Sequence, residues 1–590
     1  MATPSDDAPC ASLHIGWQLA AWLVALGVSI LGLFDAIAEF SPDMAALNAV
    51  WLLAGGVCWL LVRQRPRVVP RPAREQRWSR LDTAAAAALG MLAGCLAAGS
   101  GALLGPLPPA YHDEYSYLFG AQSVLAGRWT WPSHPSHPEL FDQLHVLNEG
   151  IMASRYYPGT ASWMAPWLAL GNPWVGHWLA GALAAAAVYG IGRELGGRRC
   201  GMIAGVLFAA APGPALFANL LLAHHPTLLG LMVFVWGFAC GQRTERWTHF
   251  LIAGMGLGCA QLCRPATAAG MALPFGIWCL ISAARQRRVP AAQWLALGCP
   301  LAGALGVMLA YNQVVAGSWW TSPYQLYTEI YTPRHVYGLN NVLRGERRLG
   351  PKVLDDYDRW AENLTPSLAW RNVLNRLLAT GSWTLDLPLL ALTAVLAVPL
   401  CLGGDVRWRL AAWAIASLHA IHWPYWYVGI MGWHYVFESA PLWCLLCGRI
   451  TDELFRAWSA GRRDVLPFWW CGLAVIAWGG MYADGPETPS RWRRGLAVIE
   501  HPRRQHADFR RWLEHTVGPT PALVLVDPRG TDPHLDFVIN APGWQSPLLV
   551  GRYRPGHTDL EAVVRDFPDR RVWYCRPDRG ELRLLSPPQK

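Results

Sequence analysis

The stretch Ile15–Phe34, "IGWQLAAWLVALGVSILGLF", contains no charged residue and is long enough to cross a membrane. A helix needs about 20 predominantly apolar residues to span the hydrocarbon core of a bilayer. A second run, "PLLALTAVLAVPLCL" at Pro388–Leu402, approaches that length. Over the whole chain 53% of the residues are hydrophobic and 15% are charged, which is too apolar for an ordinary soluble protein. The sequence therefore predicts a polytopic α-helical membrane protein.

The same length rule predicts about 13 transmembrane helices along the chain. Their expected positions are 15–38, 44–62, 82–105, 174–193, 201–220, 226–241, 248–263, 266–283, 291–311, 385–404, 410–428, 433–449 and 464–482. The 34 tryptophans fit this reading, because Trp favours the depth of the lipid headgroups.

Arginines collect in alternate loops between these helices, whereas the opposite short loops contain only Arg264. The positive-inside rule places the Arg-rich loops in the cytoplasm, together with the N-terminus. After an odd number of crossings the C-terminus lies outside. Asp6 and Asp7 replace the basic start of a cleavable signal, so we expect the first helix to remain as an anchor. The net charge of +9 then reflects topology, and no single basic patch indicates a nucleic-acid partner.

Two units are predicted: a transmembrane module at 1–484, with long outer loops at 106–173 and 312–384, and an extracytoplasmic α/β domain at 485–590. In the second unit, "ALVLVD" and "RVWYC" have the pattern of strands, and 558–566 that of a helix. An Asp- and Pro-rich turn follows the first strand and carries Asp527, Asp532, His534 and Asp536. We expect this domain to bind the acceptor or to have a structural role.

The first outer loop begins with "YHDEYSYLFG" at Tyr111–Gly120, in which two adjacent acids open an amphipathic helix. Such a helix is typical of the membrane interface. Acids at a helix start are favoured by the helix dipole and can cap free N–H groups. Asp113 and Glu114 are therefore either a cap or catalytic acids, and the motif by itself supports both interpretations equally.

Other ionisable groups are expected on the same outer side of the membrane. His134, His137, Asp142 and His145 could bind a divalent metal, although their spacing matches no standard site. Arg264 has no partner nearby in sequence, which favours an anionic ligand. His434 and Glu438 are four residues apart, so they either pair with each other or contact a ligand.

Together, "HDEYSYLFGAQSVLAGRW" at His112–Trp129, "RYYPGTASW" at Arg155–Trp163, the many spans and the outer C-terminal domain resemble the membrane glycosyltransferases of the GT-C fold. The chain is most similar to the family 39/83 group, which includes protein O-mannosyltransferases and lipid A aminoarabinose transferases. The resemblance covers roughly residues 80–450. It implies a bacterial inner-membrane enzyme that moves a sugar from a polyprenyl-phosphate carrier to a lipid, glycan or protein acceptor outside the cytoplasm, usually with inversion.

The resemblance also implies roles for individual residues. Asp113 would be the general base and Glu114 would orient the acceptor. Phosphate contacts would come from Arg264, Arg155, His224, His225 and His434, since Arg binds phosphate oxygens in a bidentate manner. Sugar or acceptor contacts would come from Tyr156, Tyr157 and Tyr324. No cofactor is expected with certainty. The Glu-Lys-Pro-Pro turn of aminoarabinose transferases is replaced by "RYYPG", which argues against lipid A and makes Arg155 a stand-in for the missing cation.

Two other classes remain open from the sequence. A transporter or lipid flippase would also have many spans, but such proteins commonly show internal repeats, and none is evident between the two halves. A non-catalytic assembly factor for envelope polysaccharide would need the same topology and no base.

Overall fold

The computed structural model describes residues 78–286, 291–403, 405–459, 466–485 and 488–586. The helices predicted at 15–38 and 44–62, and nearly all of the basic linker before Arg80, lie outside the described residues.

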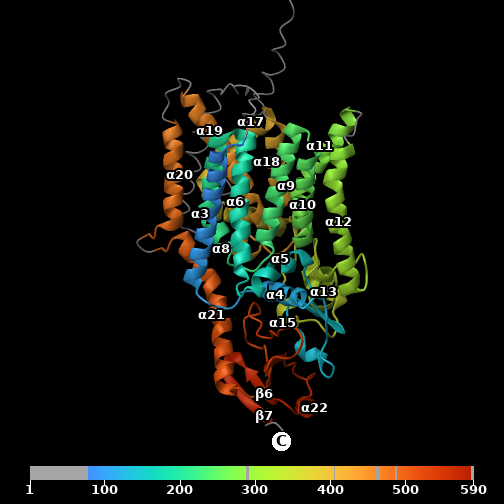
Figure 1. The fold of residues 1–590 in the computed structure, drawn as a ribbon. Coiled ribbons are helices and arrows are strands. Elements are labelled where there is room, and N and C mark those ends of the chain that lie inside the picture. Colours follow the sequence, from blue (N-terminus) through green and yellow to red (C-terminus); the bar gives the residue numbers. More distant parts are fainter. Residues whose placement is uncertain (1–77, 287–290, 404, 460–465, 486–487, 587–590) are drawn as a thin grey trace, which may run out of the picture.

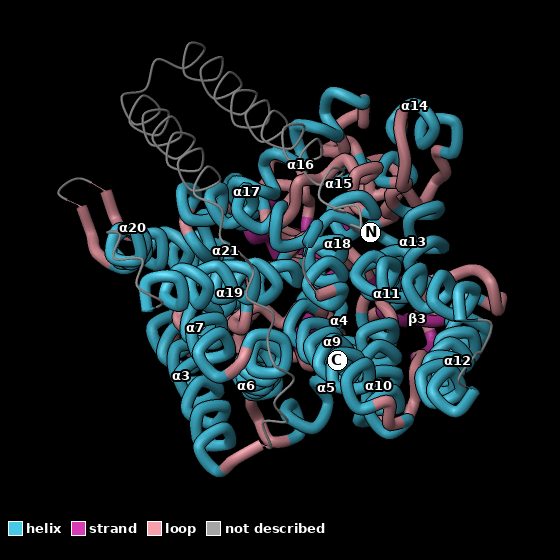
Figure 2. Tube along the Cα trace, turned by 90° about the horizontal axis from the view of Figure 1, so that it is seen from above, coloured by secondary structure: helices cyan, strands magenta, loops and turns pink. Residues whose placement is uncertain are grey.

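Long helices run side by side and form a bundle (Figure 1). They are α3 (Arg80–Leu104), α6 (Trp174–Gly196), α7 (Arg198–Ala209), α9 (His224–Thr244), α10 (Trp247–Cys263), α11 (Pro265–Gln286), α12 (Ala291–Ala316), α17 (Leu387–Gly403), α18 (Val406–Ile421), α19 (Ala440–Ser459) and α20 (Leu466–Tyr482). Most begin and end close to a predicted range, but the helices at 198–209, 406–421 and 440–459 depart from theirs by seven residues or more at one end or both. Seen from above, α20 lies at one edge of the bundle and α12 at the other (Figure 2).

Four of the described helices, α3, α6, α11 and α12, are long and apolar enough to cross a membrane by themselves. A fifth candidate is the pair Pro366–Leu385 and Leu387–Ala397, which is bent by 105° at its break. The chain is thus a mostly helical protein with several apolar spans, and the count of about 13 stays a prediction.

Two predicted helices are interrupted in the structure. The range 201–220 divides into α7 and the short α8 (Pro212–Phe217), because Ala211 is extended and Pro212 begins the new helix. The range 433–449 becomes helical only at Ala440. Before it lie the 3₁₀ turns η5 (Ile430–Gly432) and η6 (Phe437–Ser439), where Gly429 and Gly432 have positive φ. Both irregular segments lie at the same end of the bundle, and both contribute to the site described below.

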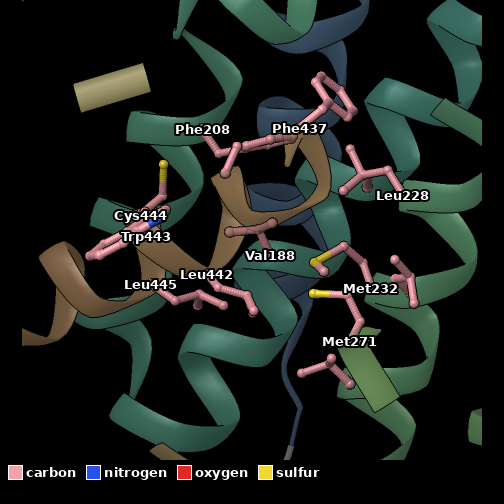
Figure 3. Close-up of a cluster of buried hydrophobic side chains, with 14 of the residues drawn as sticks. Val188, Phe208, Leu228, Met232, Met271, Phe437, Leu442, Trp443, Cys444 and Leu445 are labelled. Carbon is pink, nitrogen blue, oxygen red and sulfur yellow. The ribbon is translucent and has the colours of Figure 1, made fainter. Parts of the chain in front are cut away.

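Small residues allow the helices to approach closely. A Cβ atom added to Gly230 of α9 would lie 2.6 Å from the carbonyl oxygen of Gly256 in α10. Close backbone contact of this kind is typical of helices packed within membranes. Figure 3 shows part of the resulting core, where Phe437 lies among apolar side chains that include Phe208 and Leu228. Phe437 and the next residue, Glu438, are both fully buried.

The end of the bundle that carries the first outer loop is called the loop end here (Figure 1). The helix predicted at the acidic motif is present as α4 (His112–Leu125), but it buries Ser116 and Ser123 as well as its apolar residues, so the expected polar face is not exposed. Next come η1 (Pro138–Phe141), α5 (Pro158–Ala169) and a small antiparallel sheet in the order β1-β3-β2, formed by β1 (Trp131–Pro132), β2 (Val146–Asn148) and β3 (Ile151–Ser154).

The second long loop is largely helical. It contains α13 (Pro323–Tyr331), η2 (Pro333–His335), α14 (Asn341–Gly345), η3 (Glu346–Arg348), α15 (Asp355–Asp358), α16 (Pro366–Thr380) and the π-helical turn η4 (Gly381–Leu385). Helices α13 and α15 also lie at the loop end (Figure 1), where Tyr357 of α15 packs on His112 of α4.

The C-terminal region begins with α21 (Arg491–Val517) and ends in a sheet of order β5-β4-β6-β7. Strands β4 (Ala522–Val526), β5 (Leu548–Arg552) and β6 (Arg571–Arg576) are parallel, and β7 (Glu581–Ser586) is antiparallel to β6. Helix α22 (Leu560–Asp566) and the turn η7 (Pro577–Arg579) complete it. The strands predicted from "ALVLVD" and "RVWYC" and the helix predicted at 558–566 are therefore confirmed.

The sheet and the first outer loop share one hydrophobic core. Leu140 and Phe141 of the loop are almost fully buried and pack with Leu523, Leu549 and Phe567. A polar contact joins the same two segments: the Arg554 guanidinium donates to Asp142 at 2.9 Å. The two segments are far apart in sequence, yet each covers apolar surface that the other would otherwise expose.

A single substitution tests this shared core. Phe141→Ala should lower the free energy of unfolding of the region by about 3–5 kcal/mol, the range for truncating a buried Phe. Hydrogen–deuterium exchange should then become faster in both 131–154 and 522–552. Leu125→Ala, at a side chain that is 48% exposed, is the control. Faster exchange in the loop alone would show that the sheet is stable without it.

Candidate functional site

Asp113 lies in the first turn of α4, with a side chain that is 24% exposed. The Tyr156 hydroxyl donates a hydrogen bond to its Oδ1 atom. The same hydroxyl lies 3.1 Å from Nδ1 of His145, and that nitrogen is 3.7 Å from Asp113 Oδ1. One partly open carboxylate is therefore oriented by a tyrosine and a histidine, which leaves its second oxygen available to a ligand.

The backbone around the small sheet positions His145. Its main-chain φ is +62°, its amide donates to the Tyr327 hydroxyl at 2.9 Å, and its carbonyl accepts from Ser116 Oγ at 2.6 Å. Burial, and next the positive charge of Arg155, lower the pKa of His145 well below its ordinary value. The imidazole is therefore neutral at physiological pH. It can form a hydrogen bond with the Tyr156 hydroxyl without placing a positive charge beside Asp113.

Glu114 points away from Asp113 and is fully buried. Its carboxylate accepts from the amides of Ala110 (2.8 Å), Tyr111 (3.1 Å) and Leu221 (2.7 Å). Burial raises the pKa of Glu114, and the charge of Arg503 and these three amides act in the opposite direction. The two adjacent acids of the motif thus have different surroundings: one is open to the site and the other holds backbone.

A second cluster forms where α9, the start of α11 and the turn η6 meet. Arg264 Nη1 lies 3.0 Å from Glu438 Oε1 and 2.5 Å from His224 Nδ1. His224 Nε2 lies 3.2 Å from Nδ1 of His434. Glu438 and His224 are buried, whereas Arg264 and His434 are half-buried. The cluster therefore joins the Arg264 cation to a buried carboxylate, and 12% of the Arg264 side chain remains exposed.

The pairing differs from one sequence-based alternative. This alternative from the sequence pairs Glu438 with His434, four residues before it. In the structure Glu438 contacts Arg264 and His224, and His434 contacts His224 instead. The turns η5 and η6 replace the helix that such a pairing requires.

Tyr117 lies between the Asp113 cluster and the Arg264 cluster. Its ring stacks on Tyr156 with a centroid distance of 4.4 Å. Burial raises the pKa of Tyr117; the charge of Arg264 lowers it and that of Asp113 raises it further, so both charges act at this residue. His434 gives the same result, because burial, His224 and Arg264 lower its pKa while Asp113 opposes them. The charges of Asp113 and of the Arg264 cluster therefore both reach Tyr117 and His434.

Half-buried aromatic residues surround Asp113 on its other sides. The negative charge of Asp113 acts on Tyr357 of α15 and on Tyr427, contributing to the raised pKa that burial gives each of them. Trp360 packs on Tyr427 at 4.8 Å and on Tyr357 at 6.0 Å. Aromatic faces beside a carboxylate are the kind of surface on which a sugar ring can stack.

Arg155 is not part of the Arg264 cluster. It is 4% exposed, and its guanidinium lies over the rings of Tyr324 at 3.9 Å and Tyr327 at 4.6 Å. Its Nη2 atom donates to Thr328 Oγ1 at 3.1 Å. Arg155 therefore stacks on the tyrosines of α13, whereas Arg264 pairs with Glu438, so the two arginines belong to different parts of the site.

The remaining predicted contacts are divided between the site and its surroundings. Tyr156 and Tyr324 line the site, with their ring centroids 6.2 Å apart, and Tyr157 caps the start of α5. His225 turns away from its neighbour His224, and its Nε2 atom contacts the carbonyl of Pro214 at 3.1 Å.

The four residues considered as metal ligands are dispersed. His134 packs on Phe567, His137 lies between Glu139 and Asp566, Asp142 bonds Asn148 and Arg554, and His145 belongs to the Asp113 cluster. Within the described ranges no group of three or more His, Cys, Asp or Glu side chains converges as metal ligands would.

The acids of the C-terminal turn also separate. Asp527 pairs with Arg529, Asp536 with Arg552, and Asp532 accepts from the His534 amide. His534 itself lies 4.0 Å from the Trp360 ring, so the C-terminal region reaches the aromatic wall of the site.

Sequence reasoning did not single out Tyr117, Tyr357, Tyr427 or Arg503. Each is a common residue type whose importance depends on which distant element it faces. For Tyr427 the run "HWPYWYVG" was a signal, because so many aromatics beside a Pro indicate a fixed surface rather than a tether.

Comparisons with known proteins come from one family model and from solved structures; no curated protein matches the chain. The family model described as dolichyl-phosphate-mannose-protein mannosyltransferase matches residues 174–311, which include His224 and Arg264. The resemblance to GT-C glycosyltransferases is confirmed over this segment.

Three of the similar structures are membrane transferases. ArnT from Cupriavidus metallidurans bound to undecaprenyl phosphate has a TM-score of 0.45 at 13% identity, covering 85% of this chain and 93% of that one. The oligosaccharyltransferase of Archaeoglobus fulgidus has a TM-score of 0.43 at 11% identity, covering 76% and 61%. The protein O-mannosyltransferase Pmt1-Pmt2 complex of S. cerevisiae has a TM-score of 0.30 at 14% identity, covering 47% and 41%. TM-scores below 0.5 do not establish a common fold.

Proposed function

We propose that this protein is a GT-C glycosyltransferase that moves a sugar from a polyprenyl-phosphate carrier to a hydroxyl of an acceptor. The observation that carries the proposal is the arrangement at the loop end. A partly exposed carboxylate, Asp113, is bonded by Tyr156, whose ring stacks on Tyr117, and the charge of the cation Arg264 also acts on Tyr117. The family match over residues 174–311 supports the same reaction class.

The residues divide the chemistry between them. The acceptor oxygen attacks the anomeric carbon, and its proton passes to the free oxygen of Asp113 as the new C–O bond forms. The bond from the anomeric carbon to the phosphate oxygen breaks, and the electron pair leaves with the phosphate. Arg264 and His434 stabilise the charge that develops there. Tyr156 and neutral His145 orient Asp113, since a general base must lie within hydrogen-bond reach of the proton it takes.

The position of the site fits a lipid-linked donor. The carrier's tail can stay among the exposed apolar helices while its phosphate reaches Arg264 at the loop end. The arginines in the last turns of α6, α9, α11 and α19 lie at the opposite end of these helices. By the positive-inside rule the loop end then faces away from the cytoplasm, with the N-terminus inside and the C-terminal region outside, in a bacterial inner membrane.

The substrates are proposed only as classes. The donor is a polyprenyl-phosphate-linked sugar, and the acceptor is a lipid, a glycan or a protein. Lipid A is disfavoured by the altered turn at Arg155–Gly159, where Tyr157 stands directly before Pro158 and begins α5 as its cap. A transporter or flippase would not require an oriented base beside a cation.

A direct experiment distinguishes these classes. Purified protein in nanodiscs is incubated with a panel of radiolabelled polyprenyl-phosphate sugars and a membrane extract as acceptor, and products are separated by chromatography. Transfer of label to an acceptor, with release of polyprenyl phosphate, supports the proposal. Movement of the lipid across the bilayer with no chemical change would contradict it and favour a flippase.

Asp113→Asn should abolish transfer and leave folding intact. The amide keeps the shape and can still meet Tyr156, but it cannot take a proton; loss of general-base catalysis costs about 10²- to 10⁴-fold in rate. The assay is initial-rate transfer with protein matched by size-exclusion profile. Glu139→Gln, at a side chain 54% exposed, is the control. Full activity in Asp113→Asn would show that another group is the base.

Arg264→Gln should weaken use of the donor. Losing a hydrogen bond to a charged group costs about 1.5–3 kcal/mol, so kcat/KM for the donor should fall roughly 10- to 100-fold. Arg264→Lys keeps the charge beside Glu438 and should recover part of this loss. Arg246→Gln, at an exposed residue of the opposite end, should behave as wild type. Equal kcat/KM in Arg264→Gln and wild type would remove Arg264 from the phosphate site.

A further inference from the structure

Helix α21 connects the last helix of the bundle to the C-terminal sheet, and its middle turns contact the start of α4. Arg503 and His506 on this helix are 2% and 5% exposed. The His506 ring lies 5.2 Å from the ring of Tyr115, which follows Glu114. A buried arginine at this position takes no part in the reaction proposed above, so its role needs another explanation.

Arg503 holds the segment that leads into α9. Its Nη2 atom donates to the carbonyl of Asn219, and its guanidinium lies 5.2 Å from the Trp174 ring. The Trp174 indole N–H donates to the same carbonyl at 3.0 Å. The Asn219 side chain in turn donates to the carbonyls of Ala97 and Ala215, at 2.9 Å each. Asn219 is therefore fixed from both its backbone and its side chain.

Residues 219–224 connect three parts of the site. Asn219 is held by Arg503 of the C-terminal region. The Leu221 amide donates to Glu114 at 2.7 Å, so the segment is tied to the helix that carries Asp113. His224 then begins α9 and belongs to the Arg264 cluster. A shift of this segment would move the base and the phosphate-binding group relative to each other.

The charges of Arg503 and Glu114 also balance each other. Burial lowers the pKa of the Arg503 guanidinium, and Glu114 is the strongest influence in the opposite direction. For Glu114 the strongest influence against burial is Arg503. Each charge therefore favours the ionised form of the other, in addition to the hydrogen bonds that each group makes with the backbone.

We propose that Arg503 is a positioning residue, which fixes residues 219–224 and the start of α4 from the C-terminal region and so keeps Asp113 aligned with the Arg264 cluster. This inference rests on the proposed transferase function. It makes α21 a part of the catalytic apparatus and gives the C-terminal sheet, which shares its core with the first outer loop, a role in the rate of the reaction.

The test compares Arg503→Met, Arg503→Lys and the matched control Arg504→Met in full-length protein in nanodiscs. Arg504 is the next residue on α21, has a side chain 66% exposed and pairs with Glu500. In Arg503→Met, kcat measured on the monodisperse fraction should fall about 10- to 100-fold, because a small misplacement of reacting groups slows a reaction by factors of this size. The KM for the donor should change little. Arg503→Lys keeps the charge and should recover most of the loss. Arg504→Met should match wild type.

A second measurement does not depend on activity. Hydrogen–deuterium exchange of residues 218–224 and 110–116 should become faster in Arg503→Met and stay as in wild type in Arg504→Met. Wild-type kcat in Arg503→Met, or unchanged exchange in both segments, would overturn the inference. If Arg503→Met does not fold, Arg503→Gln carries the same two predictions. If wild type transfers no sugar but exchange responds as expected, the proposed function fails and the structural coupling stands.

Discussion

An ionised group inside an apolar helical bundle must have a partner, and this constraint organises the loop end. Glu438 is fully buried and is matched there by Arg264 and His224. Glu114 is equally buried and is matched by three backbone amides and by the charge of Arg503. These contacts leave the side chains of Asp113 and Arg264 partly exposed at the loop end. The proposed transfer reaction needs both groups to be accessible.

The broken helices at 210–223 and 422–439 serve the same constraint. A continuous helix satisfies its own backbone and offers little to a ligand, whereas a break exposes amides and carbonyls that must be bonded elsewhere. Here those groups are bonded by functional side chains: Leu221 by Glu114, Asn219 by Arg503 and the His434 carbonyl by Arg264. The irregular backbone thus needs these side chains to satisfy its polar groups, and the same bonds hold the side chains in place.

Much of the fold could be predicted from the sequence because apolar runs of fixed length identify helices directly. Most of the described long helices begin and end near their expected residues, and a helix begins at the acidic motif as expected. The amphipathic pattern of α4 was misleading, because the structure buries Ser116 and Ser123 as well as Phe119. The break at Pro212 was missed, since this residue lies in a segment as apolar as the spans around it. A turn was expected at 429–432, but the structure extends the break over 422–439, between the end of α18 and the start of α19. The motif at Asp113 and Glu114 could be found, but not the different surroundings of its two acids. Those depend on Leu221 and Arg503, which are distant in sequence and carry no local signal.

The site combines elements from the bundle, both long loops and the C-terminal region, so the reaction depends on how these parts are held together. The most direct test is a cryo-EM structure of the protein in nanodiscs with a polyprenyl-phosphate-linked sugar that it accepts. The account predicts the phosphate against Arg264 and His434, with the anomeric carbon facing Asp113 and the sugar on the aromatic wall that includes Tyr357. A phosphate bound elsewhere on the bundle, with this region empty, would contradict it.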